Sequence, residues 1–125
     1  MTTILIIDDD ETLCMLLQMM LESCGHTVHL VLDSRDAVAR MQAHSPDIVL
    51  LDTFMHPIDG PETLTALRAV PGGAEMPVIM MSGSDDPDTR ARIERAGANA
   101  FVYKSMDLEK TVQEIVETMK TLLGK

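Results

Sequence analysis

The sequence predicts an α/β fold in which helices cover both faces of a five-stranded parallel sheet. Five short apolar runs with the length of buried strands occupy residues 4–7, 28–31, 48–51, 78–81 and 100–103. The first, third and fourth are almost continuously apolar, as expected of strands that are buried on both faces. A segment with helix start and stop signals follows each run. Regular alternation of strands and helices favours a doubly wound sheet with right-handed crossovers.

Residues that open or close helices lie after every apolar run. In chain order they are Asp10 and Gly25 for the first helix, Asp33 or Ser34 for the second, Gly60 and Pro61 for the third, Asp86, Pro87 and Gly97 for the fourth, and Asp107 for the last, which runs nearly to Lys125. Five such units suit the strand order 2-1-3-4-5 of flavodoxin-like folds.

Length and composition indicate one globular domain, which we expect to span residues 1–125 without an appended effector. Apolar residues make up 46% of the chain, and 20 acidic against 10 basic side chains give a net charge of −10. Since an acidic surface repels DNA, RNA and anionic membranes, we expect no nucleic-acid partner. No apolar run approaches the roughly 18 residues of a membrane span, and no signal peptide is visible. We therefore expect a cytoplasmic protein without membrane insertion.

Acidic, hydroxyl and lysine side chains stand at the carboxyl ends of the predicted strands. Asp8 and Asp9 follow the first strand, Asp52 the third, Ser82 the fourth and Lys104 the fifth. In the order 2-1-3-4-5 the first and third strands are neighbours, so the three aspartates should meet at one edge. Converging carboxylates need positive charge, which Lys104 or a hard cation such as Mg²⁺ can supply. Such a set suits phosphoryl transfer to a carboxylate nucleophile.

Each of these residues also has a purely structural interpretation. Asp8 or Asp10 could cap a helix, and Asp52 could be a turn residue before a loop. The match of several positions at the ends of four strands favours the functional interpretation.

The sequence resembles the receiver domains of bacterial response regulators over essentially its whole length. The resemblance rests on residues 4–10 (ILIIDDD), 47–52 (DIVLLD), 59–60 (DG), 77–83 (PVIMMSG) and 96–104 (AGANAFVYK). It implies a stand-alone, chemotaxis-regulator-like or phosphorelay receiver that works as a phosphorylation-activated switch in a two-component system. Its partners would be a histidine kinase or histidine phosphotransfer protein and a downstream target protein. It would not be an enzyme beyond self-phosphotransfer and autodephosphorylation.

The resemblance also assigns the acidic positions. Asp52 is implied as the phosphoacceptor, and Asp9 as a direct ligand of Mg²⁺. Asp8 would bind the ion through water or support Asp9. Asp52 and the backbone carbonyl of Phe54 would complete the protein's ligands.

Three further positions carry the implied response to phosphorylation. Lys104 would pair with one phosphoryl oxygen, and the Ser82 hydroxyl would bind another. Phe101 matches the aromatic residue of the switch, which is expected to turn inward as Ser82 moves. The signal would leave through the surface of helix four, strand five and helix five.

Three departures from the family pattern give further expectations. His56 replaces a usual proline, and it could contact the phosphodonor or simply be an exposed loop histidine. Ser105 replaces a proline with a cis bond, and we expect the Lys104–Ser105 bond to be cis so that Lys104 points at Asp52. Bulky Phe54, two residues after Asp52, could exclude water and lengthen the phosphorylated lifetime.

The first predicted helix carries a core stripe and an apolar shoulder beside it. The stripe is expected to comprise Leu13, Leu16, Leu17, Met20, Leu21 and Cys24. Thr12, Met15 and Met19 form the shoulder. The two methionines either dock the helical bundle of a phosphodonor, as the resemblance implies, or fill space under a loop. Cys14 and Cys24 are expected to be buried thiols that form no disulfide.

Three alternative functions remain open on the sequence. A receiver fold could bind partners without being phosphorylated. A Mg²⁺-dependent phosphohydrolase would also use a nucleophilic aspartate, but Phe54 stands where such enzymes of the haloacid-dehalogenase type place a second one. A flavodoxin-like cofactor binder lacks support, because acidic residues replace a phosphate-binding loop after the first strand.

Overall fold

A single parallel sheet forms the centre of the molecule. The computed structural model describes residues 2–124, in which five strands pair in the order β2-β1-β3-β4-β5. The strands are β1 (Thr3–Ile7), β2 (Thr27–Val31), β3 (Ile48–Asp52), β4 (Val78–Ser82) and β5 (Ala100–Tyr103). All neighbouring strands are parallel. The predicted fold class and strand order are confirmed.

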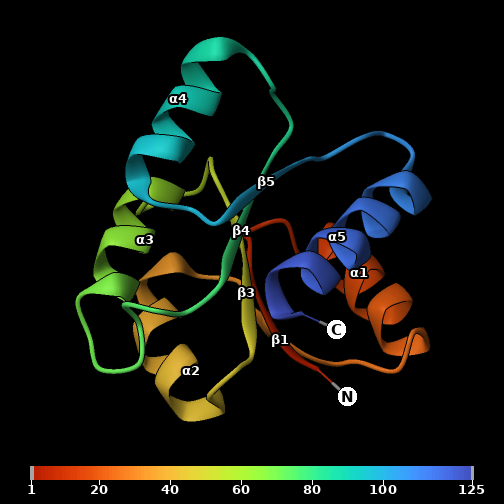
Figure 1. The fold of residues 1–125 in the computed structure, drawn as a ribbon, viewed down its shortest axis with the longest axis horizontal. Helices are drawn as coiled ribbons and strands as arrows, with labels where there is room; N and C mark the ends of the chain where they lie inside the picture. The colour runs from red at the N-terminus through yellow and green to blue at the C-terminus, as the bar shows by residue number, and fades with distance from the viewer. Residues whose placement is uncertain (1, 125) are drawn as a thin grey trace.

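The helices cover the sheet on two sides (Figure 1). They are α1 (Glu11–Ser23), α2 (Ala37–His44), α3 (Gly60–Arg68), α4 (Pro87–Ala96) and α5 (Leu108–Leu123), and the short 3₁₀ helix η1 (Ser34–Asp36) leads into α2. One core packs Ile4 and Ile6 of β1 against α1 and α5. The other packs Leu5 and Ile7 against α2, α3 and α4. The two cores follow from the alternation of side chains along a strand.

Aspartate side chains cap four of the five α-helices in the part of the chain that the structure describes. Asp10, Asp59, Asp86 and Asp107 each accept a hydrogen bond from the backbone N–H three residues further on. At the second helix Asp33 caps η1 by accepting from the N–H of Arg35. The four capped helices follow the carboxyl ends of β1, β3, β4 and β5, so the caps fix the chain next to the loops that carry the acidic residues.

The cysteines and the core stripe of α1 correct the sequence interpretation. Cys14 is buried, but Cys24 is exposed because it lies at the C-cap, where the helix has passed the core. Leu16, placed in the stripe from its spacing, is 42% exposed, and Cys14 takes its place in the core. Among residues 2–124, no helix has the length and apolar character needed to cross a bilayer.

Candidate functional site

Three aspartates meet where β1 and β3 end. Asp8 directly follows β1, and Asp52 is the last residue of the neighbouring β3. One carboxylate oxygen from each of Asp8, Asp9 and Asp52 lies within 4.8 Å of the others. Asp8 is completely buried and Asp52 almost so, whereas Asp9 is exposed. The predicted convergence of these carboxylates is therefore present.

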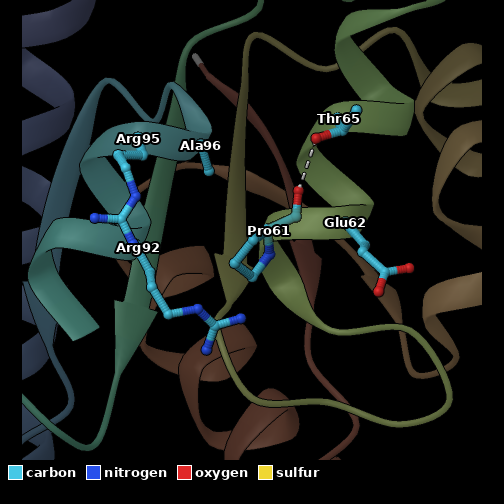
Figure 2. Close-up of a pocket in the computed structure, with 6 residues that line it drawn as sticks. All are labelled: Pro61, Glu62, Thr65, Arg92, Arg95 and Ala96. Carbon is cyan, nitrogen blue, oxygen red and sulfur yellow. Dashed lines mark hydrogen bonds between the residues drawn. The ribbon is translucent and has the colours of Figure 1, made fainter. Parts of the chain in front are cut away.

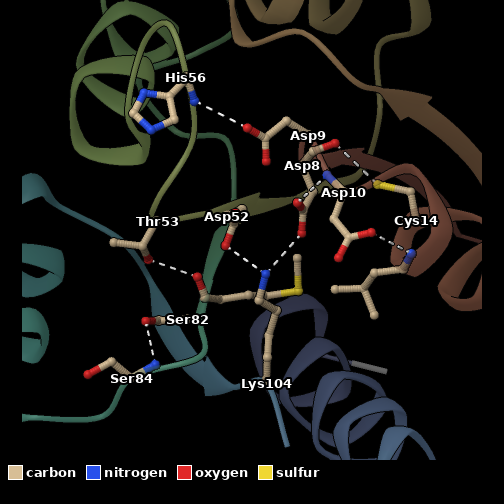
Figure 3. Close-up of polar contacts among 12 residues, drawn as sticks. Asp8, Asp9, Asp10, Cys14, Asp52, Thr53, His56, Ser82, Ser84 and Lys104 are labelled. Carbon is tan, nitrogen blue, oxygen red and sulfur yellow. Dashed lines mark hydrogen bonds and ion pairs between the residues drawn. The ribbon is translucent and has the colours of Figure 1, made fainter. Parts of the chain in front are cut away.

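Lys104 supplies the counter-charge from the far side of β4. Its Nζ lies 2.8 Å from Oδ1 of Asp52 and 3.1 Å from Oδ2 of Asp8 (Figure 3). The backbone N–H of Lys104 donates to the carbonyl of Ser82 at 2.7 Å, which extends the β4–β5 ladder by one residue. The pairing of β4 with β5 therefore positions the Lys104 side chain so that its Nζ contacts the buried carboxylates of both Asp8 and Asp52.

Burial dominates the electrostatics of Asp52. Desolvation, followed by the charge of Asp8, raises the pKa of Asp52 to about 6, although Lys104 acts in the opposite direction. Burial alone would lower the pKa of Lys104, but its hydrogen bond to Asp52 and the charges of Asp52 and Asp8 leave that pKa raised. The site therefore holds more negative charge than one lysine offsets, and it favours an additional cation.

The donor set fits a hard divalent cation. Carboxylate oxygens are the ligands that Mg²⁺ prefers, with water completing its octahedral shell. Asp8 and Asp52 are held by Lys104, while exposed Asp9 leaves the cluster open to solvent on one side. Asp8, Asp9 and Asp52 could therefore hold the ion.

Two supports of the acidic residues were not recognised in the sequence. The Cys14 thiol donates to the backbone carbonyl of Asp8 at 3.3 Å. Burial, followed by the charges of Asp8 and Asp10, raises the pKa of Cys14 to about 12, so this thiol stays neutral and serves packing. The N–H of Asp10 donates to Oδ1 of Asp8 at 3.0 Å. The spacing of Cys14 from Leu17 and Leu21, three and seven residues on, was the signal that could have placed Cys14 on the core face of α1.

Ser82 and Phe101 lie on adjacent strands but have different surroundings. Ser82 is buried at the end of β4, where its Oγ accepts from the N–H of Ser84 at 3.0 Å. Phe101 is partly buried against the α2–α3–α4 core, and the guanidinium of Arg90 lies 4.7 Å from its ring centroid. The structure thus brings Ser82 to the same edge as Asp52, but the Ser82 hydroxyl contacts the backbone of Ser84 and not the carboxylates.

The loop after β3 contacts Asp9 through His56, which stands where the family usually has proline. The N–H of His56, which a proline would lack, donates to Oδ2 of Asp9 at 3.2 Å. The imidazole of His56 is exposed, and its ring turns away from Asp9 in Figure 3. Phe54, on the same loop, is 50% exposed.

The expected cis bond between Lys104 and Ser105 is wrong. Within residues 2–124, the cis peptide bond of the structure is His56–Pro57. A cis bond before a non-proline residue costs about 2.5–4 kcal/mol, and Lys104 reaches both carboxylates without it. The N–H of Ser105 donates to Oγ1 of Thr111 at 2.9 Å, which ties the loop to α5. The trans loop therefore uses a donor that proline does not have.

Comparisons with known proteins agree with this geometry. Residues 4–116 match the model of the response regulator receiver domain family. The chain is 32% identical over 114 residues to the transcriptional regulatory protein ZraR of Salmonella typhimurium, covering 91% of this chain and 25% of ZraR. It is 32% identical over 122 residues to the response regulator MprA of Mycolicibacterium vanbaalenii, covering 98% of this chain and 50% of MprA.

A solved structure gives the same result for the fold. The signal receiver domain of a signal transduction histidine kinase from Syntrophus aciditrophicus superposes with a TM-score of 0.85 at 27% identity, covering 99% of this chain and 91% of that one. The chain spans a quarter to a half of the two curated relatives, so the resemblance concerns their receiver portions. With its sheet order, its acidic edge and the family match over residues 4–116, the chain belongs to the response regulator receiver domain family.

Proposed function

We propose that this receiver domain accepts a phosphoryl group on Asp52 from a phosphohistidine and thereby switches a two-component signalling pathway. The observation that carries the proposal is the geometry of Asp52. Its carboxylate is almost fully buried, lies 2.8 Å from Nζ of Lys104, and adjoins the carboxylates of Asp8 and Asp9. A carboxylate fixed beside a cation and a potential metal site is suited to in-line attack on phosphorus.

The proposed step is a transfer between two nucleophiles. An oxygen of Asp52 attacks phosphorus, an O–P bond forms, and the P–N bond to the donor histidine breaks. The imidazole leaves with the electron pair and takes up a proton. The product is an acyl phosphate on Asp52.

Each neighbouring residue has a proposed role in that step. Lys104 binds one phosphoryl oxygen, and the hydroxyl of Ser82 binds another. Asp8, Asp9, Asp52 and the backbone carbonyl of Phe54 are the proposed ligands of Mg²⁺. When bound, the ion neutralises charge on the phosphoryl oxygens. Ser82 and Phe101 are the proposed switch residues, because both lie on strands that adjoin α4 or α5.

The partners follow from the family. We infer a histidine kinase or histidine phosphotransfer protein as the donor, and a target protein that contacts the surface of α4, β5 and α5. Both would meet the receiver in the cytoplasm. The acidic chain, with a net charge of −10, gives no reason to propose nucleic acid as a partner of this domain.

One experiment tests the assignment of Asp52. The protein is incubated with Mg²⁺ and a small phosphodonor such as acetyl phosphate, and its mass is recorded with and without EDTA. We expect the mass of one phosphoryl group to be added only with Mg²⁺, and the gain to be absent from Asp52→Ala.

Two results would contradict the proposal. No mass gain in the parent protein would support a receiver fold that binds partners without phosphorylation. Sustained release of phosphate from unrelated esters would support a phosphohydrolase instead.

A further inference from the structure

An ion pair joins α4 to the beginning of α3. Nη2 of Arg92 lies 3.1 Å from Oδ2 of Asp59. Arg92 lines a groove of about 320 Å³ between the two helices, together with Pro61, Glu62, Thr65, Arg95 and Ala96. Figure 2 shows the Arg92 side chain crossing from α4 towards Pro61 at the start of α3. Of the ion pairs found in residues 2–124, this one connects α4 to another element.

The two carboxylate oxygens of Asp59 contact two different helices, α3 and α4. Oδ1 accepts from the N–H of Glu62 at 3.0 Å and caps α3, whereas Oδ2 faces Arg92. The carbonyl of Asp59 accepts from the hydroxyl and the N–H of Thr63 at 2.8 Å and 2.9 Å. Asp59 is thus rigidly attached to the first turn of α3, and Arg92 holds that turn against α4.

The next residue packs directly on the backbone of Asp52. A Cβ at Gly60 would lie 2.3 Å from the carbonyl oxygen of Asp52 and 2.8 Å from Cα of Thr53, so no side chain fits there. The N–H of Gly60 also donates to the carbonyl of Thr53 at 2.8 Å. Close-packed groups transmit displacement, because they have no free volume to absorb it. A shift of Asp59 therefore reaches the backbone at Asp52 and Thr53.

We propose that Arg92 is a positioning residue for the phosphorylation site, because it holds Asp59, and through Gly60 the backbone of Asp52, in a fixed position relative to α4. This inference rests on the proposed function and adds a physical connection between Asp52 and one helix of the proposed signalling surface. Coupling of this kind is reciprocal. A partner that displaces α4 therefore alters the backbone position of Asp52, and occupation of the Asp52 site alters the environment of Arg92.

The pair is partly exposed, so its effect is moderate. The side chains of Arg92 and Asp59 are 42% and 33% exposed. Ion pairs at such positions are weak and are screened by salt. Loss of the pair is therefore expected to change the phosphorylation rate about two- to fivefold at low ionic strength, and less at high ionic strength.

The test compares variants that remove only the pair. Arg92→Gln removes the cation, and Asp59→Asn removes the anion while its side-chain oxygen can still cap α3. Arg95→Gln is the matched control, since it removes one arginine from the same helix and groove but leaves the pair of Arg92 and Asp59 intact. Arg92→Lys keeps a positive charge at this position. The measurements are the Mg²⁺-dependent rate of Asp52 phosphorylation by acetyl phosphate at low and high salt, the thermal midpoint, and the backbone amide shifts of Asp52 and Thr53.

The coupling predicts a specific pattern. Arg92→Gln and Asp59→Asn should change the rate and the two amide shifts alike, the double variant should add little to either, and Arg92→Lys should recover most of the rate. Arg95→Gln should match the parent protein. The rate difference should shrink at high salt, which a general loss of stability would not produce.

Two further outcomes separate the inference from the function on which it rests. If the parent protein is phosphorylated and Arg92→Gln behaves as Arg95→Gln does, the coupling is refuted and the function stands. If the parent protein is not phosphorylated, the proposed function fails, and the amide shifts alone decide the coupling. Unchanged shifts at Asp52 and Thr53 in Arg92→Gln would then refute it as well.

Discussion

Nζ of Lys104 and Oδ1 of Asp52 lie 2.8 Å apart, although β4 separates the strands from which they come. Lys104 also reaches Asp8 at 3.1 Å, so one cation serves two buried carboxylates. Burial, followed by the negative charge of Asp8, nevertheless raises the pKa of Asp52 to about 6. In the absence of a second cation, the ionised form of Asp52 therefore destabilises the folded protein.

The first prediction concerns stability and pH in metal-free protein. The folded pKa of Asp52 is about 6 against an ordinary value of 3.8. Between these values the folded protein holds more protons on this group than the unfolded chain, so the contribution of Asp52 to stability falls as the pH rises from about 4 to about 6. At pH 8 we expect Asp52→Asn to be more stable than the parent protein by about 1–3 kcal/mol.

Urea unfolding in EDTA at pH 8 and pH 4 measures this difference. The difference in the free energy of unfolding between Asp52→Asn and the parent protein should be smaller at pH 4 than at pH 8. When Mg²⁺ replaces EDTA, it should stabilise the parent protein more than the variant. A variant that is less stable than the parent at pH 8 would show that the charge of Asp52 is fully compensated.

The second prediction concerns Arg68, the last residue of α3. Its guanidinium donates to the carbonyls of Gly73, Met76 and Gly97 and to Oδ1 of Asn99. Because Arg68→Met would leave several acceptors without a donor, we expect a loss of about 2–3 kcal/mol in the free energy of unfolding. Arg35→Met, which alters an exposed pair, should change it by less than about 1 kcal/mol. Equal losses in the two variants would contradict the bridging role.

The third prediction concerns the lifetime of the phosphorylated state. Phe54 lies two residues after Asp52 and is half exposed, so its ring can exclude water from the acyl phosphate. We expect Phe54→Asn to lose the phosphoryl group several-fold faster than the parent protein, and Phe54→Tyr, which keeps the ring, to behave as the parent does. The decay is followed by mass after the donor is removed. If the parent protein loses the phosphoryl group as fast as Phe54→Asn does, or faster, the proposed role of Phe54 is refuted.

The fourth prediction concerns the donor surface on α1. Met15 and Met19 are 53% and 67% exposed, so they do not fill the core. If they contact the phosphodonor protein, Met15→Lys and Met19→Lys will slow transfer from that protein and leave the reaction with acetyl phosphate unchanged. Unchanged transfer from the protein donor would refute docking at this position.

Local sequence determined most of the fold. Capping by Asp10, Asp86 and Asp107 involves a residue and its neighbour three positions on, so it can be recognised without tertiary information. The apolar runs likewise predicted the five strands and, with their order, the meeting of Asp8 and Asp52.

Only the tertiary structure decided how side chains distant in the chain pair. The sequence placed Lys104 near the aspartates, but it did not predict that Lys104 contacts both Asp8 and Asp52, nor that Arg92 meets Asp59 across 33 positions. The hydrogen bond from the N–H of Ser105 to a hydroxyl of α5 and the exposure of Cys24 likewise depend on how the helices pack. Local propensities carry no information about such contacts, because a contact between distant residues exists only after the helices have packed on the sheet.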